Sequence, residues 1–166
     1  VKGSPQKTIP VGELVRNAHY RSRGTLAAVD SLRQKSCPPA FVTYFLEVEV
    51  NTETGQIKPT RVVMGCDCGT VIDPVLAAGQ LHGGLYRGLG FALLEDTDYD
   101  PETGKLTCEG YVRDCKLLTP LELPDAAEIK LFFTNTREPT GPFGAKGIGE
   151  AALNPVAGAV ANAIYN

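Results

Sequence analysis

The sequence lacks two features that mark common classes of binding and membrane protein. Its 16 Lys and Arg residues are scattered rather than clustered, and the formal net charge is −3, so no nucleic-acid surface is expected. No apolar run approaches the roughly 18 residues that a membrane-spanning helix needs. The composition, 43% hydrophobic and 21% charged, is typical of a globular domain. We therefore expect neither nucleic acid nor a membrane as a partner.

The cysteines also lack the spacing of a disulfide framework or a metal site. There are five, at positions 37, 66, 68, 108 and 115. An odd number at irregular spacing favours free thiols in a reducing cytoplasm. Cys66 and Cys68 form a C-x-C pair, but no second pair stands at the spacing of a zinc site. None of the five has ferredoxin-type spacing, so an iron–sulfur cluster on this chain is not expected.

No low-complexity linker divides the 166 residues, a length that suits one domain, and the first residue is Val1 rather than Met. We expect a single domain over residues 1–166 that is a piece of a longer protein. Hydrophobic periodicity and turn residues predict an α+β fold with a mixed or antiparallel sheet, a glycine-rich helix and a C-terminal helix. The predicted elements are helices over 10–20, 74–94 and from 154–155 onward, strands over 41–50, 57–66 and 125–135, and turns at 51–56 and 100–105, the second joining two short strands.

The helix over 74–94 is unusual because it contains five glycines. Asp73 followed by Pro74 is a typical helix start, with Asp as the N-cap. Each interior glycine costs roughly 1 kcal/mol relative to alanine, so the glycines need a reason. They form two pairs with helical spacing, Gly79/Gly83 and Gly84/Gly88. Such stripes allow either tight helix packing or the close approach of a cofactor, and the sequence leaves both open.

The second glycine-rich stretch, "GPFGAKGIGE" (141–150), has three interpretations. Residues 147–152 match the dinucleotide pattern G-x-G-x-x-A, but the chain ends before a βαβ unit could be completed. A plain surface turn is the second interpretation. The third is an active-site loop, in which glycines expose backbone N–H groups to a ligand. Glu150, just before an apolar helix, would then be partly buried and suited to act as a general base.

Two long segments make the third interpretation specific. "GPFGAKGIGEAALNPVAGAVANAIYN" and "CDCGTVIDPVLAAGQLHGGLYRGLGFALLE" resemble the end of the molybdenum subunit in the xanthine dehydrogenase/aldehyde oxidase family. The segments "IPVGELVRNAHY" and "YFLEVEVNTETGQIKPTRVV" resemble the parts that precede its glycine-rich helix. The resemblance covers nearly the whole chain, and the motifs follow one another in the same order as in the family. It implies the C-terminal, molybdopterin-binding domain of a larger subunit.

The resemblance assigns roles to particular residues. Glu150 matches the catalytic glutamate of the family, and Gln80 matches a glutamine that contacts the pterin. The other positions that match cofactor-binding segments are Cys68, Gly69, Thr70, Lys146, Gly147 and Gly149. The chain departs from the family pattern at Asp73, where Asn is common, and at Arg87, where Gln is common. Arg87 could meet a cofactor phosphate or a neighbouring domain, or face solvent.

The resemblance also implies the chemistry. A molybdenum-dependent hydroxylase oxidises a carbon next to nitrogen or oxygen in an aldehyde or an N-heterocycle, with water as the oxygen source and Glu150 as the base. The molybdenum is held by molybdopterin, expected in its cytosine dinucleotide form, and by no protein ligand of this chain. Iron–sulfur clusters and FAD are expected on other domains or subunits, so the isolated chain should be inactive. A nucleotide-binding domain, or a relative that kept the fold without the molybdenum chemistry, is the alternative.

Overall fold

The computed structural model describes residues 3–21, 24–31, 33, 36–107, 117–134 and 136–166, so Cys108 and Cys115 lie outside the described residues. The chain divides into two compact units, residues 1–33 and 34–166. The first unit contains one helix, α1 (Val11–Tyr20), which begins after Pro10 as the sequence predicts. In α1 only Ala18 is buried.

The second unit is built on a three-stranded mixed sheet with the order β1-β2-β3. β1 (Phe41–Val50) and β2 (Ile57–Asp67) pair antiparallel, with Phe41 opposite Asp67 and Val50 opposite Ile57. The turn between them places Gly55 at φ 74°, the left-handed conformation expected of a glycine there. β3 (Ile129–Phe133) runs parallel to β2. The predicted α+β class with a mixed sheet is confirmed.

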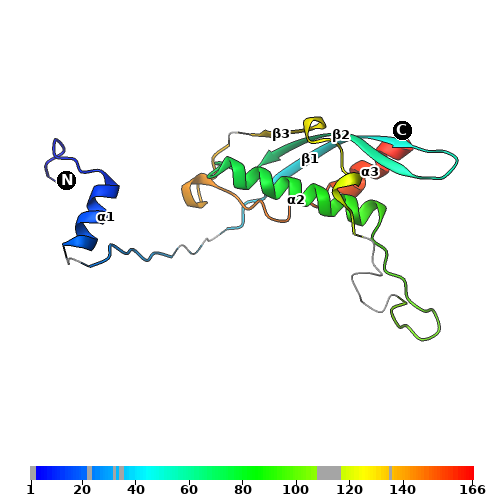
Figure 1. Cartoon of the computed structure of the whole chain (residues 1–166), viewed down its shortest axis with the longest axis horizontal. Helices are drawn as coiled ribbons and strands as arrows, with labels where there is room; N and C mark the ends of the chain where they lie inside the picture. Colours follow the sequence, from blue (N-terminus) through cyan, green and yellow to red (C-terminus); the bar gives the residue numbers. More distant parts are fainter. Residues whose placement is uncertain (1–2, 22–23, 32, 34–35, 108–116, 135) are drawn as a thin grey trace. The chain divides into compact units, whose positions relative to one another are not determined.

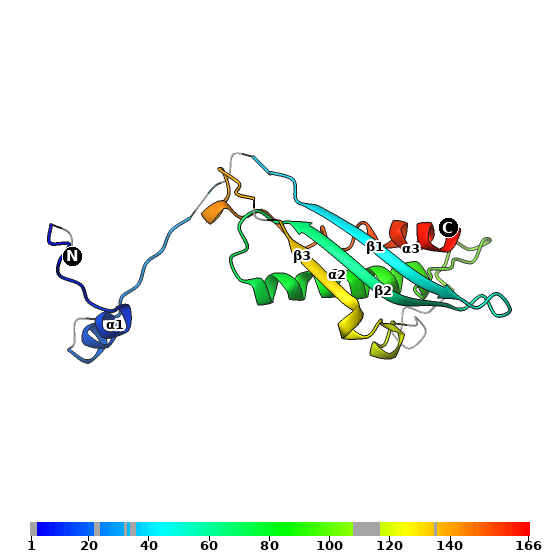
Figure 2. The same cartoon turned by 90° about the horizontal axis from the view of Figure 1, so that it is seen from above.

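Two helices cover one face of this sheet, as Figures 1 and 2 show. α2 (Pro74–Leu93) is the glycine-rich helix, and α3 (Val156–Tyr165) is the C-terminal helix. Asp73 caps α2 as predicted, because its carboxylate accepts hydrogen bonds from the backbone N–H groups of Val75 and Leu76 at 2.9 and 3.0 Å. The core lies between the two layers and consists of alternate strand residues and one face of each helix: Tyr44, Val62, Met64, Cys66, Leu81, Leu85, Leu89, Val156 and Val160.

Two sequence-based predictions were wrong in extent. The strand predicted over 125–135 is shorter, because residues Ala126–Glu128 form a turn of 3-10 helix before β3 begins. Two short strands were expected around the turn at 100–105; among the described residues, which stop at 107 on this side of the turn, it closes a single bridge between Tyr99 and Leu106. A turn of the expected kind does form, since Gly104 has φ 66° and the Asp100 carboxylate accepts two backbone hydrogen bonds. Local hydrogen bonding replaced extended pairing at both places.

Candidate functional site

Two turns meet at the C-terminal end of β2 and form one wall of the site. Gly69 pairs with Ala145 in an isolated antiparallel bridge. On either side of it, the Thr70 N–H donates to the Gly144 carbonyl and the Lys146 N–H donates to the Cys68 carbonyl, both at 2.8 Å. The glycine-rich loop 141–150 is therefore fixed directly beside the turn that contains Cys68–Thr70.

Gly69 shows why this junction needs glycine. Its φ is 68°, and a Cβ added there would lie 2.4 Å from the Gly144 carbonyl oxygen and 3.1 Å from the Lys146 nitrogen. Both neighbours are backbone atoms, which cannot move aside without breaking the bridge. Two facts therefore exclude a side chain at position 69. The backbone there has a positive φ, and the backbone of the facing loop lies too close for a Cβ.

An ion pair holds the same two turns together from the other side. The Lys146 ammonium lies 2.7 Å from an Asp67 carboxylate oxygen, and the two side chains are only 10% and 17% exposed. The other carboxylate oxygen accepts a hydrogen bond from the Gly69 N–H at 3.0 Å and one from the Thr136 hydroxyl. The hydrogen bonds from Lys146 and then Thr136 lower the pKa of Asp67 to about 2.

Lys146 is therefore committed to Asp67, which changes what can be expected of it. Its ammonium also lies 5.4 Å from the ring centroid of Phe41, a cation–π distance. Lys146 stabilises the loop through its charge, and the part it presents to a ligand is its stem and backbone. Sequence reasoning missed Asp67, although its place between two cysteines at the end of a strand and two residues before a glycine could have drawn attention to it.

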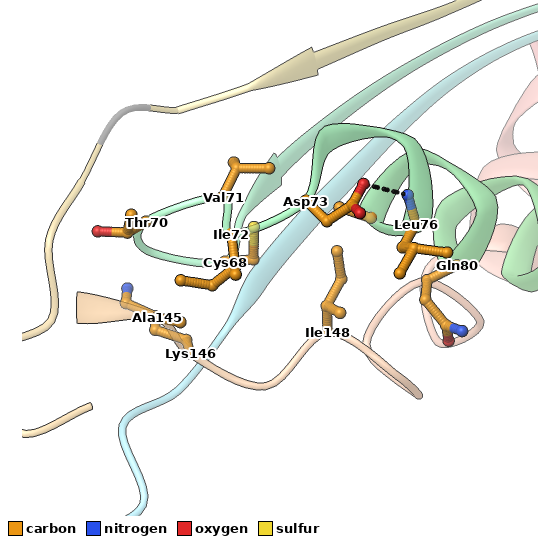
Figure 3. Close-up of a pocket in the computed structure, with 11 residues that line it drawn as sticks. Cys68, Thr70, Val71, Ile72, Asp73, Leu76, Gln80, Ala145, Lys146 and Ile148 are labelled. Carbon is orange, nitrogen blue, oxygen red and sulfur yellow. Dashed lines mark hydrogen bonds between the residues drawn. The ribbon is translucent and has the colours of Figure 1, made fainter. Parts of the chain in front are cut away.

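Beside these turns is a hollow of about 390 Å³ between the segment after β2, the first turns of α2 and the loop residues 145–148 (Figure 3). Four of the predicted cofactor-binding residues line it: Cys68, Thr70, Gln80 and Lys146. The rest of its lining is mostly apolar: Val71, Ile72, Leu76, Ala77, Ala145 and Ile148, with Asp73 at the helix start. We call this space the first hollow.

A second hollow of about 460 Å³ lies against the next turns of α2, and it contains the predicted base. It is lined by Gly79, Gln80, Gly83, Gly84, Arg87, Phe91, Gly149, Glu150 and Leu153. Gln80 lines both hollows, so the two spaces adjoin at this side chain. The fold thus brings together Gln80 and Glu150, which are far apart in the sequence.

Two features of the loop differ from expectation. Glu150 was expected to be partly buried, but its side chain is exposed in this chain. Gly147, predicted to bind cofactor, lines neither hollow and has open space where a side chain would be. Residues 149–155 form turns, and α3 begins only at Val156.

This geometry also argues against the dinucleotide pattern at 147–152. That fingerprint needs a helix that opens directly at the glycines, so that its N–H groups face a pyrophosphate. Here residues 149–155 are turns, and the helix begins at Val156. The match of residues 147–152 is therefore one of sequence pattern and not of structure.

The glycines of α2 differ in what surrounds them, and one pair shows the tight packing that the sequence allowed. A Cβ on Gly84 would lie 2.4 Å from the Ala152 Cβ, and one on Gly88 would lie 2.5 Å from the Val156 Cβ. A Cβ on Gly79 or Gly83 would meet nothing within 4 Å. Gly84 and Gly88 therefore permit tight packing against Ala152 and Val156, whereas Gly79 and Gly83 leave open space at the second hollow.

In the described part of the chain, no group of three or more His, Cys, Asp or Glu side chains is arranged to hold a metal ion. The same part contains no helix that is both long and apolar enough to cross a membrane. Burial raises the pKa of Cys66 to about 12, so this thiol is protonated at neutral pH and is a poor metal ligand.

Comparison with known proteins identifies the family of the chain. Residues 1–124 match the family model of the molybdopterin cofactor-binding domain. The chain belongs to this family. Over 154 residues it is 32% identical to the xanthine dehydrogenase molybdenum-binding subunit of Escherichia coli O157:H7, an alignment that covers 92% of this chain and 20% of that protein. It is 33% identical over 156 residues to the carbon monoxide dehydrogenase large chain of Afipia carboxidovorans, covering 91% of this chain and 18% of that one.

Solved structures share the fold of this molybdopterin cofactor-binding domain. The CO dehydrogenase from Oligotropha carboxidovorans superimposes with a TM-score of 0.78 at 32% identity, covering 99% of this chain and 20% of that one. Quinoline 2-oxidoreductase from Pseudomonas putida 86 gives a TM-score of 0.72 at 28% identity, covering 99% and 21%. The chain spans about a fifth of the length of these relatives, and the resemblance inferred from its motifs is confirmed.

The residues at the two hollows fit a pterin cofactor that holds its own metal. The Gln80 amide is exposed and makes no hydrogen bond to any described residue, so both its donor and its acceptor can pair with a heterocycle. Gly149 adds backbone without a side chain to the second hollow. The first hollow is lined mostly by apolar side chains, which suits a flat ring system.

Proposed function

We propose that the chain is the C-terminal part of the molybdenum subunit of a hydroxylase that oxidises an aldehyde or an N-heterocycle, with water as the oxygen source. The observation that carries the proposal is that Gln80 and Glu150 line one hollow in a chain of the molybdopterin cofactor-binding domain family. Relatives named for xanthine, quinoline and carbon monoxide show that this domain type serves oxidoreductases of several substrates.

Each residue of the chain then has a limited task. The molybdenum cofactor, when bound, supplies the two-electron oxidation. The Glu150 carboxylate accepts the proton lost by the water-derived nucleophile. Gln80, at the meeting point of the two hollows, orients the cofactor through its amide. Asp67 and Lys146 keep the glycine-rich loop in place beside the Cys68–Thr70 turn. They thereby help to position Glu150, which ends the same loop.

The exposure of Glu150 supports a role for partners. A carboxylate in water is a weak base at neutral pH, and burial is the usual way to raise its pKa. The remainder of the molybdenum subunit, about four-fifths of the length of the relatives, would cover the hollow and supply that burial. The cofactor is proposed in its cytosine dinucleotide form, and iron–sulfur and flavin groups on other domains or subunits would carry the electrons away. The odd number of cysteines and their irregular spacing support a cytoplasmic location.

The substitution Glu150→Gln in the enzyme that contains this chain tests the proposal. Turnover should fall at least about 100-fold, because a missing general base typically costs that much, while the molybdenum content stays normal. Glu49→Gln, an exposed position on β1, is the matched control and should leave turnover unchanged. Retained turnover in Glu150→Gln would remove this residue from the mechanism.

A further inference from the structure

Arg87, one of the two residues that depart from the family pattern, lies in the second hollow with Glu150 and Gln80. Gln80 and Arg87 are seven residues apart on α2, so they share a face and are separated by about 10 Å along the helix axis. Arg87 and Gln80 therefore line one hollow about two helical turns apart.

The Arg87 guanidinium is held by an aromatic contact and has no anionic partner among the described residues. Its central carbon lies 5.1 Å from the ring centroid of Phe91, four residues further along the same helix face. This cation–π contact restricts the side chain without using up its N–H donors. No carboxylate among the described residues pairs with Arg87, although Glu150 lines the same hollow. An unpaired cation and an unpaired carboxylate thus line one cavity.

The space between these two charges suits a small organic ligand. The hollow measures about 460 Å³, within the range of pockets that hold such molecules. Its floor is backbone at Gly79 and Gly83, where a side chain would meet no atom within 4 Å. A ligand with one negative charge would be attracted to Arg87 and repelled by Glu150, so it could lie only with its anion at Arg87 and its uncharged part at Glu150.

We propose that Arg87 binds the carboxylate of an anionic substrate and so presents the uncharged, reacting end of that substrate to Glu150. The inference rests on the proposed function, since it takes Glu150 as the base. An oxyanion of the cofactor, its phosphate, has the same chemistry as a carboxylate. A substrate is favoured because Arg87 lines the same hollow as Glu150, the proposed base. Bidentate pairing of guanidinium and carboxylate gives the orientation that this role needs.

Binding of two unreactive probes to the assembled enzyme tests the inference without relying on turnover. Benzoate and benzamide have nearly the same shape, but only benzoate is charged. Calorimetry should show that the enzyme prefers benzoate, and that Arg87→Gln weakens benzoate binding about tenfold or more while benzamide binding changes less than about twofold. Arg87→Lys should restore part of the preference. Lys58→Gln, which removes an exposed charge on β2, is the control and should change neither.

Each other outcome overturns the inference. An enzyme with no preference for benzoate, or equal losses of both probes in Arg87→Gln, would mean that Arg87 has no anion-binding role in the hollow. A lower molybdenum content in Arg87→Gln, with the benzoate preference unchanged, would assign Arg87 to a cofactor phosphate. The proposed function is judged separately, because Glu150→Gln can abolish turnover at normal molybdenum content whatever happens to probe binding in Arg87→Gln.

Discussion

Two neighbouring glycines of α2 allow the packing of the domain to be tested by a single methyl group. Gly83 and Gly84 are adjacent in the sequence but point to different surroundings. Gly84→Ala would place a Cβ 2.4 Å from the Ala152 Cβ, 2.9 Å from the Ala152 carbonyl carbon and 3.1 Å from the Leu153 nitrogen. Gly83→Ala would place the same methyl group in open space at the second hollow.

The expected effects have opposite signs. Replacing an interior helical glycine with alanine favours the helix by about 1 kcal/mol, and this gain applies at both positions. At Gly84 two of the three facing atoms are backbone, so relief requires α2 and the segment leading into α3 to separate. Because backbone atoms must move, the cost of overpacking here falls in the upper part of the usual range, at about 2–3 kcal/mol. We therefore expect Gly83→Ala to raise the free energy of unfolding by about 1 kcal/mol and Gly84→Ala to lower it by about 1–2 kcal/mol.

Urea unfolding of the purified protein, followed by far-UV circular dichroism, measures this difference. The free energy of unfolding should be higher than that of the wild type in Gly83→Ala and lower in Gly84→Ala, with a difference of about 2–3 kcal/mol between the two variants. Gly79→Ala, also in open space, should behave like Gly83→Ala. Equal effects at Gly83 and Gly84 would refute the division of the helix into a packing face and an open face.

Further predictions concern the loop anchor and the thiols. The pKa of Asp67 is lowered to about 2 in the fold, so its stabilisation, about 2 kcal/mol, should be complete above about pH 4 and lost as the pH falls toward 2. Asp67→Asn, which leaves the Lys146 ammonium without its anion, should therefore unfold in less urea at pH 7 and show a much smaller loss of stability between pH 4 and 2. An unchanged acid profile would contradict the role of this ion pair. In alkylation followed by mass spectrometry, the exposed Cys37 should be modified in the native protein, whereas the buried Cys66 and Cys68 should be modified only after unfolding. Rapid modification of either buried thiol would show that the β2 end is open.

Local patterns were sufficient to predict most of the fold. The alternation of Glu and Val at the end of 41–50 and the cap at Asp73 are short-range signals, and both elements formed where expected. The strand over 125–135 was overestimated because a 3-10 turn at 126–128 competes locally with extended structure, and propensity does not decide between them. Element boundaries thus depended on hydrogen bonds that residue types alone do not specify.

The site was predicted in part, and its errors come from long-range contacts. The sequence indicated Gln80 and Glu150, and the fold places both at one hollow. It did not indicate that Lys146 pairs with Asp67, 79 positions away, because nothing local to either residue requires the other. The sequence also did not predict that Glu150 is exposed, because the burial of a carboxylate in a loop depends on which other parts of the protein cover that loop.

Elemental and nucleotide analysis of the native complex that contains this chain tests the molybdenum hydroxylase assignment most directly. We expect about one molybdenum per chain, together with iron and a released cytidine or pterin species. An intact, correctly assembled complex that contains no molybdenum would contradict the proposed function. Glu150 would then be an exposed carboxylate at a loop end, in a domain that has kept its fold without the chemistry.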